Sequence, residues 1–141
     1  MRKTLPETDL GKFLHHMNGF FEFIKQTFPN DKDLEYYHDQ FLEFKKYNAS
    51  LIAQMFVEST IPYEAHILSR NDKFFLDELK LEELQKNMPQ NLPINIGDYE
   101  KGLYEKIRRL WLTDLEKTAK NTIWKYFAIL LGYGKKTMNL M

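Results

Sequence analysis

The sequence predicts an all-α fold, a compact bundle of about five main helices with an irregular segment at residues 69–97. Three observations lead to this prediction. Apolar residues recur at spacings of three and four in five separate stretches, as on the buried face of an amphipathic helix. Capping residues precede these stretches, and proline or glycine follows several of them. No internal repeat is visible, so a solenoid is excluded.

The first helix is expected from Thr8 to Phe28. Thr8 or Asp9 can cap its free N–H groups, and Pro29 ends it by disfavouring a helical conformation in the residue before. Three phenylalanines, Phe13, Phe20 and Phe23, widen the apolar stripe beyond what one neighbouring helix can cover. We therefore expect this helix to be central and packed on two sides. Its stripe consists of Leu10, Leu14, Met17, Phe21, Ile24 and Phe28.

The second and third helices are expected on either side of Asn48. The second opens at Asn30, with Asp33 as a weaker form of the capping box, and Asn48 caps the third, which runs through Ser59. Pro62 then begins a further short helix. The apolar positions are Leu34, Tyr37, Phe41 and Phe44, then Leu51, Ile52, Met55 and Phe56, and finally Ile67 and Leu68.

Residues 69–97 show weaker helical signals. Residues 69–72 are typical of a turn or cap, and the prolines and asparagines of residues 88–97 predict a long loop. A short extended stretch at residues 92–96 is compatible with the same fold class.

The fourth helix is expected from about Asp98, with Leu103, Ile107, Leu110 and Trp111 on one face. Gly102 within it indicates either close packing or local weakness. A capping box from Thr113 to Glu116 begins the last helix, and Gly132 with Gly134 ends it. Its stripe consists of Leu115, Ala119, Ile123, Phe127 and Leu130, flanked by Trp124 and Ile129. This predicts one helical domain, residues 1–134, followed by a flexible basic tail, residues 135–141.

Composition excludes several classes of protein. Hydrophobic residues make up 43% and charged residues 28% of the 141 residues, which is typical of a globular domain. Cysteine is absent, which excludes disulfides, thiolate metal sites and cysteine nucleophiles. The sequence lacks both an apolar run long enough to span a bilayer and the pattern of a secretory signal, so we expect a cytoplasmic protein.

The histidines do not form a recognisable catalytic or metal-binding motif. His15 and His16 are adjacent, so they point about 100° apart on a helix, while His38 and His66 stand apart in the sequence. The glycines near residue 132 lack the spacing of a phosphate-binding loop. We therefore expect a protein without enzymatic activity, cofactor or metal.

The aromatic content of 15% is the better indication of function. Helices with apolar residues around more than half of their circumference are either central or part of an interface. We therefore predict a non-enzymatic helical module for protein–protein interaction, its partner being a second copy or another protein. The interface candidates are Phe13, Phe20, Phe23, Trp124 and Tyr126.

Nucleic-acid binding is the alternative. The net charge is zero, but residues 1–97 carry a net charge of −4 and residues 98–141 a net charge of +4. If the last two helices presented one basic face, it could bind phosphates, and Trp111 and Trp124 could stack on bases. The candidate contacts are Lys106, Arg108, Arg109, Lys117, Lys120 and Lys125.

Three stretches together carry a resemblance to known proteins: residues 28–34 (FPNDKDL), residues 61–76, which begin IPY and end NDKFFL, and residues 121–127 (NTIWKYF). In this order the chain resembles small uncharacterised helical proteins of large nucleocytoplasmic DNA viruses, of the mimivirus-like and algal-virus kind. The resemblance covers about residues 20–131. It implies a viral structural or host-interaction factor in the host cytoplasm or the virion, and it assigns no role to any residue.

Overall fold

The computed structural model of the chain describes residues 8–78, 94–113 and 115–140. These residues form five α-helices, a 3-10 turn at Ile61–Tyr63 and a π-helical turn, η2, at Phe74–Glu78. The predicted all-α bundle of about five helices is confirmed. Within the described part of the chain, none of the helices is both long enough and apolar enough to cross a membrane.

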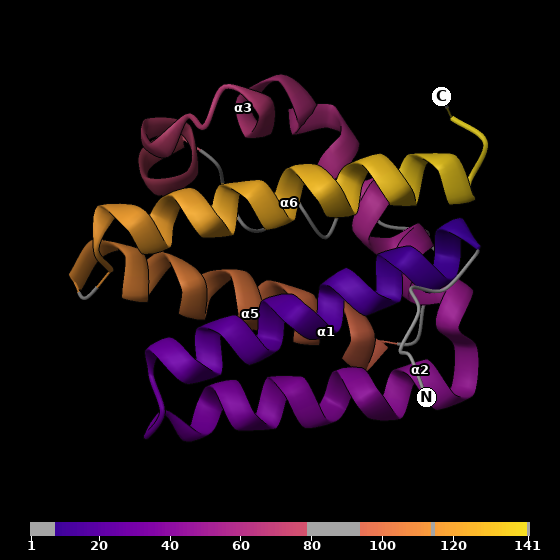
Figure 1. Cartoon of the computed structure of the whole chain (residues 1–141), viewed down its shortest axis with the longest axis horizontal. Helices are drawn as coiled ribbons and strands as arrows, with labels where there is room; N and C mark the ends of the chain where they lie inside the picture. The colour runs from indigo at the N-terminus through magenta and orange to yellow at the C-terminus, as the bar shows by residue number, and fades with distance from the viewer. Residues whose placement is uncertain (1–7, 79–93, 114, 141) are drawn as a thin grey trace, which may run out of the picture.

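Helix α1 (Asp9–Thr27) is central, as its wide apolar stripe predicts. It lies between α2 (Lys32–Thr60) and α6 (Lys117–Thr137) and runs antiparallel to α6 and to the first half of α2 (Figure 1). The Thr8 hydroxyl caps it by accepting a hydrogen bond from the Gly11 N–H at 2.9 Å. Five of its apolar side chains are buried, namely Phe13, Met17, Phe20, Phe21 and Ile24.

The two helices predicted around Asn48 follow one another without a loop and form α2. Asn48 has a non-helical backbone (φ −158°, ψ 86°), and its side-chain oxygen accepts from the Leu51 N–H at 3.2 Å. Asn48 is therefore the predicted cap, placed at a kink. The start of α2 differs by one residue, because Asp31 and not Asn30 is the N-cap and accepts from the N–H groups of Asp33 and Leu34.

The predicted end of the last helix at Gly132 and Gly134 is wrong. Helix α6 continues through both glycines to Thr137, and neither has a positive φ. A methyl group added to Gly134 would lie 2.5 Å from Cγ2 of Val57. Gly134 therefore allows α6 to approach the second half of α2 closely, and Lys135, placed by the sequence in a tail, lies within the helix.

The start of α6 also differs from the prediction. Helix α5 (Ile94–Thr113) includes Thr113 as its last residue, and α6 begins only at Lys117 with Glu116 as its N-cap. The Leu115 N–H donates to the Leu110 carbonyl, so this residue extends the end of α5. The capping box predicted from Thr113 to Glu116 is therefore wrong.

Helix α5 begins four residues before the predicted start. Residues 94–97 are helical, which contradicts the loop and the extended stretch predicted there; residues 88–93 lie outside the described part of the chain. The short helix after Pro62 is confirmed as α3 (Glu64–Leu68), although Ile67 is buried and Leu68 is exposed.

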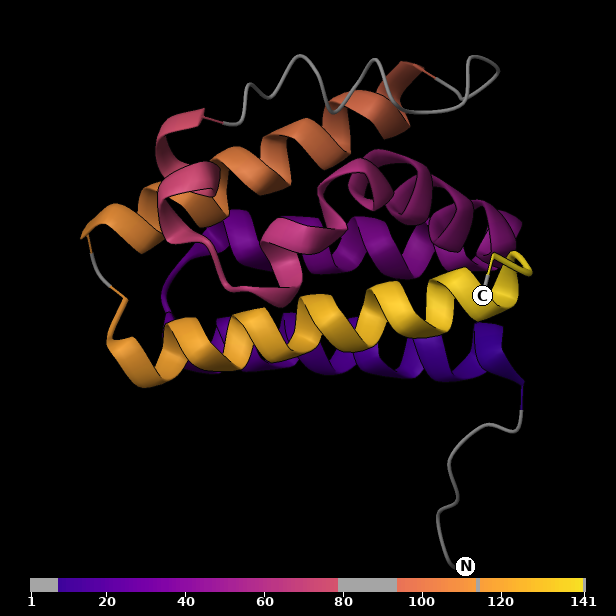
Figure 2. The same cartoon turned by 90° about the horizontal axis from the view of Figure 1, so that it is seen from above.

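Helix α5 lies along one edge of the bundle (Figure 2). Its buried side chains are Ile107, Leu110 and Trp111. At its first half, the Tyr99 hydroxyl donates to the Tyr37 carbonyl at 2.7 Å. A methyl group added to Gly102 would lie 2.6 Å from the Tyr37 hydroxyl, so of the two readings of Gly102 the structure supports close packing.

Candidate functional site

Most of the aromatic residues predicted to form an interface lie in the core. Phe13, Phe20 and Trp124 are 0%, 1% and 3% exposed. Phe23 and Tyr126 are partly buried and pack against each other, with ring centroids 6.2 Å apart. The aromatic surplus is thus largely accounted for by stacking within the domain. Phe13 and Phe20 are corrected from interface candidates to core residues, whereas Trp124 is buried but lines the pocket described below.

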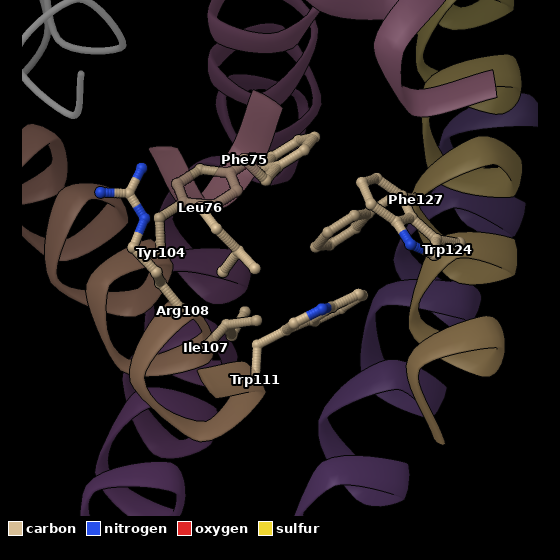
Figure 3. A pocket seen from close by; sticks show the side chains of 8 residues that line it. All are labelled: Phe75, Leu76, Tyr104, Ile107, Arg108, Trp111, Trp124 and Phe127. Atoms are coloured by element: carbon tan, nitrogen blue, oxygen red, sulfur yellow. The ribbon is translucent and has the colours of Figure 1, made fainter. Parts of the chain in front are cut away.

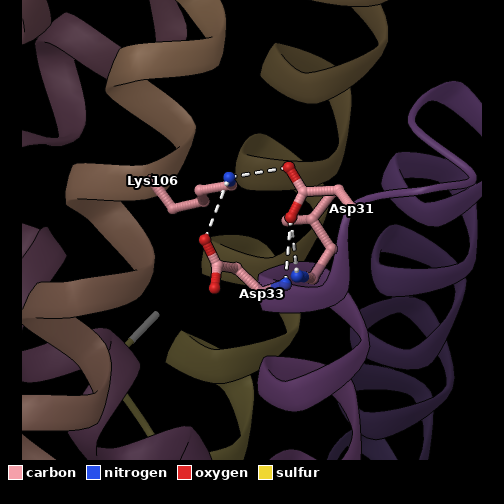
Figure 4. A network of polar contacts seen from close by, with 4 residues as sticks. Asp31, Asp33 and Lys106 are labelled. Atoms are coloured by element: carbon pink, nitrogen blue, oxygen red, sulfur yellow. Dashed lines mark hydrogen bonds and ion pairs between the residues drawn. The ribbon is translucent and has the colours of Figure 1, made fainter.

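Lys106 is corrected in the same way, from a candidate nucleic-acid contact to a structural residue. Its ammonium group bridges two carboxylates at the start of α2, 2.6 Å from Asp31 Oδ2 and 3.2 Å from Asp33 Oδ2 (Figure 4). The Lys106 and Asp31 side chains are only 14% and 18% exposed. Lys106 therefore attaches α5 to the N-terminus of α2.

The pKa values of this pair reflect the contact. Burial alone would raise the pKa of Asp31, but hydrogen bonds from Lys106 and from the Leu34 N–H outweigh it and lower the pKa. For Lys106, burial acts to lower the pKa, and the two carboxylates outweigh it and raise the pKa. Both groups are therefore held in their charged forms.

The other basic candidates do not share one face with an exposed indole. Arg109, Lys117 and Lys125 are exposed, and Arg108 and Lys120 are partly buried. The two tryptophans are buried against each other, with ring centroids 5.4 Å apart at 74°, so neither offers a free face to a base. The structure therefore does not bring together the stacking platform of the nucleic-acid hypothesis.

The two tryptophans line an apolar pocket between α5, η2 and α6 (Figure 3). The enclosed space is about 30 Å³, and the depression around it, counted out to open solvent, is about 400 Å³. A space of this size accepts the tip of one inserted side chain. The described lining residues are Phe75, Leu76, Tyr104, Ile107, Arg108, Trp111, Trp124 and Phe127.

The two indoles differ in their hydrogen bonding. Trp124 Nε1 donates to Asp72 Oδ1 at 2.9 Å. Trp111 is 7% exposed, and its buried Nε1 has no hydrogen-bond partner among the described residues. Buried polar groups are normally paired, and an unpaired donor is an exception that calls for a physical explanation. The pocket thus contains a donor without an acceptor.

Basic and apolar side chains lie around the pocket, together with Asp72, which is bonded to Trp124. Arg108 lines the pocket, and Leu112, one helical turn further on α5, is 64% exposed. The Lys120 ammonium lies 5.9 Å from the centroid of the Trp111 ring. These residues, together with the pocket lining, are called the α5–α6 face below.

A second depression, an open polar cleft of about 380 Å³, lies at the turn between α1 and α2 and includes Glu35 and His38. The buried His38 ring contacts Asn18 Oδ1 through Nε2 at 2.7 Å and Lys25 Nζ through Nδ1 at 3.0 Å. Burial and then the Lys25 charge lower the pKa of His38. The neutral ring, donating to Asn18 and accepting from Lys25, satisfies this geometry.

Sequence reasoning missed the burial of His38, although a signal was present. Its position, four residues after Leu34 and three before Phe41, places it on the buried stripe of α2. Glu35 and His38 also have the spacing of Glu-x-x-His metal motifs. Both ring nitrogens are already bonded, so the cleft is better explained as a structural network than as a reactive site.

The described residues offer little for a metal or cofactor. Among them, the structure has no group of three histidine, aspartate or glutamate side chains that could hold a metal ion. His16 stacks on Tyr133 and His66 stacks on Phe74, on different elements. The α5–α6 face is therefore the stronger candidate for function.

Comparison of the chain with protein-family models, with curated proteins and with solved structures finds no match. The described residues form a small all-α bundle, and the aromatic pocket of the α5–α6 face is the feature from which a function can be proposed.

Proposed function

We propose that this protein is a non-enzymatic interaction module that binds a protein partner through the α5–α6 face. The observation that carries the proposal is the apolar pocket with the unpaired Trp111 N–H beside the exposed Leu112. Protein interfaces concentrate their binding energy in a few side chains that fill such pockets. A helix edge with an apolar residue next to a pocket is also the arrangement used to bind amphipathic segments.

Nucleic-acid binding remains the second candidate, supported by the exposed Arg109, Lys117 and Lys125. It is disfavoured because both indoles are buried and Lys106 is paired with carboxylates. Mobility-shift measurements with single- and double-stranded DNA and RNA at two salt concentrations test it. Binding that falls steeply with salt would favour this alternative, because phosphate contacts release counterions.

Site-specific photo-crosslinking tests the protein-partner proposal. A benzoylphenylalanine residue is placed at Leu112, beside the pocket, or at Tyr47, which is 84% exposed on α2. The resemblance to viral proteins is the reason to search virions and infected-cell cytoplasm for the partner. We expect a discrete crosslinked product from position 112 and not from position 47. Equal crosslinking from both positions, or none from position 112, would contradict the proposal.

A further inference from the structure

We infer that the α5–α6 face recognises an acidic segment whose apolar side chain enters the pocket while a carbonyl or carboxylate oxygen accepts a hydrogen bond from Trp111 Nε1. This inference rests on the proposed function and deepens it by naming the chemistry of the partner. It depends on three properties of the described residues: the unpaired donor, the polarity of the lining and the charge of the rim.

The first property is the unpaired donor. Trp111 is buried to more than nine-tenths and its N–H has no acceptor within the described ranges, whereas Trp124 in the same pocket is paired with Asp72. An indole nitrogen can only donate. A group that satisfies it must therefore bring a lone pair, as the oxygen of a backbone carbonyl or a carboxylate does.

The second property is the apolar character of the lining. Apart from the indoles, only Tyr104 and Arg108 among the described lining residues carry polar side-chain atoms, and none of the lining residues is acidic. A guanidinium group, like an indole, only donates. A water molecule is held well by two to four polar partners of both kinds, so this mostly apolar pocket suits an acceptor on an apolar body better than water.

The third property is the charge of the rim. Lys120 lies over the Trp111 ring, and Lys117 is exposed one turn before it on α6. Complementary charge accelerates and orients association, so a segment with aspartate and glutamate around an apolar anchor fits this face.

Synthetic peptides and the two indole N–H signals test the inference. The probes are twelve-residue peptides with one central leucine flanked by aspartate and glutamate, the same peptide with serine in place of leucine, and a lysine-flanked analogue. In protein labelled with 15N at tryptophan, the acidic leucine peptide should shift the Trp111 N–H signal strongly and the Asp72-bonded Trp124 signal weakly. The other two peptides should leave both signals unchanged.

Variants give a second readout. Trp111→Phe keeps an aromatic ring and removes the N–H, so affinity for the acidic peptide should fall about three- to tenfold, the value of one neutral hydrogen bond. Lys120→Gln should reduce affinity and flatten its salt dependence. Lys46→Gln, on α2 with its side chain 71% exposed, is the matched control and should change neither quantity.

The outcomes separate the two proposals. Binding of the leucine peptides regardless of charge, without a Trp111 shift, would overturn the inference and leave the proposed function intact. If no peptide binds but position 112 still gives a crosslinked product, the inference is likewise overturned and the proposed function stands. Absence of both peptide binding and crosslinking would reject both. If Trp111→Phe does not fold, the wild-type indole shifts and the Lys120→Gln titration still decide the question.

Discussion

Trp111 and Trp124 touch each other, yet they belong to regions that are held together differently. Trp124 belongs to the packed unit of α1, α2 and α6, in which the buried His38 has two partners, and its N–H is bonded to Asp72 just before η2. Trp111 belongs to α5, which borders two apolar gaps that share Tyr104, Ile107 and Phe127. The difference indicates that α1, α2 and α6 form the framework. In the proposed function, α5 would provide the surface where a partner completes the packing.

The largest expected effects come from truncating core side chains of the framework. Ile123 and Phe41 are 1% and 2% exposed, so Ile123→Ala and Phe41→Ala should each lower the free energy of unfolding by about 2–5 kcal/mol. Ile107→Ala on α5 should cost about 2 kcal/mol, at the lower end, because this side chain borders both unfilled spaces, whereas Phe41 borders one and Ile123 neither. Chemical denaturation measures all three. If the free energy of unfolding falls by less than about 0.5 kcal/mol at both framework positions, the burial of these two side chains is contradicted.

A pair of glycines in α6 tests how closely the framework is packed. Gly134→Ala should destabilise the protein by about 1–3 kcal/mol, because the added methyl group meets Val57 of α2. Gly132 has no atom within 4 Å of an added methyl group, so Gly132→Ala should stabilise the helix by about 1 kcal/mol. If thermal or chemical denaturation shows a stability change of the same sign for both variants, the close contact between Gly134 and Val57 is contradicted.

The attachment of α5 to the framework should give a smaller effect. Lys106→Met removes the contact with Asp31 and Asp33 and should cost about 1–2 kcal/mol, since the pair is largely shielded from water. The control is Lys46→Met, which removes an exposed pair with Glu43 and should cost close to nothing. A double-mutant cycle with Asp31→Asn measures the coupling energy between the two side chains. A coupling energy of zero would contradict this attachment.

The pH dependence of stability should show the smallest effect. The pKa of His38 is lower in the folded protein than in the unfolded chain, so protonation favours unfolding. The stability that this neutral histidine provides is present above its unfolded pKa and is lost as the pH falls through and below about 6.5. His38→Gln should therefore flatten the decline in unfolding free energy that chemical denaturation measures between pH 7 and pH 5.

The comparison also explains which parts of the fold the sequence predicts. Apolar stripes and the caps Thr8 and Asn48 depend on neighbouring residues, and they predict α1 and both halves of α2. Gly134 fails as a helix end because a contact with Val57, distant in the sequence, decides its role. The capping box at Thr113 fails because α5 extends through that residue.

The candidate site was predicted only in part. The sequence singled out Trp111, Trp124 and the basic residues around them, but spacing alone cannot show which side chain finds a partner across the bundle. Lys106 meets Asp31 and Trp124 meets Asp72 through contacts between elements far apart in the chain, and Trp111 finds none. The pocket exists only through this three-dimensional arrangement.

The kink at Asn48 has a consequence for how the chain tolerates changes in length. A straight helix of the 29 residues of α2 would extend about 44 Å, well beyond the roughly 29 Å of α1. Asn48 caps the second half of α2 as a new helix. The direction in which the side chains of residues 51–60 point is therefore set independently of residues 32–47. We therefore expect one residue inserted at this junction to lower the melting temperature less than the same insertion at Phe41 or Phe56, which would turn the following residues of the helix by about 100°.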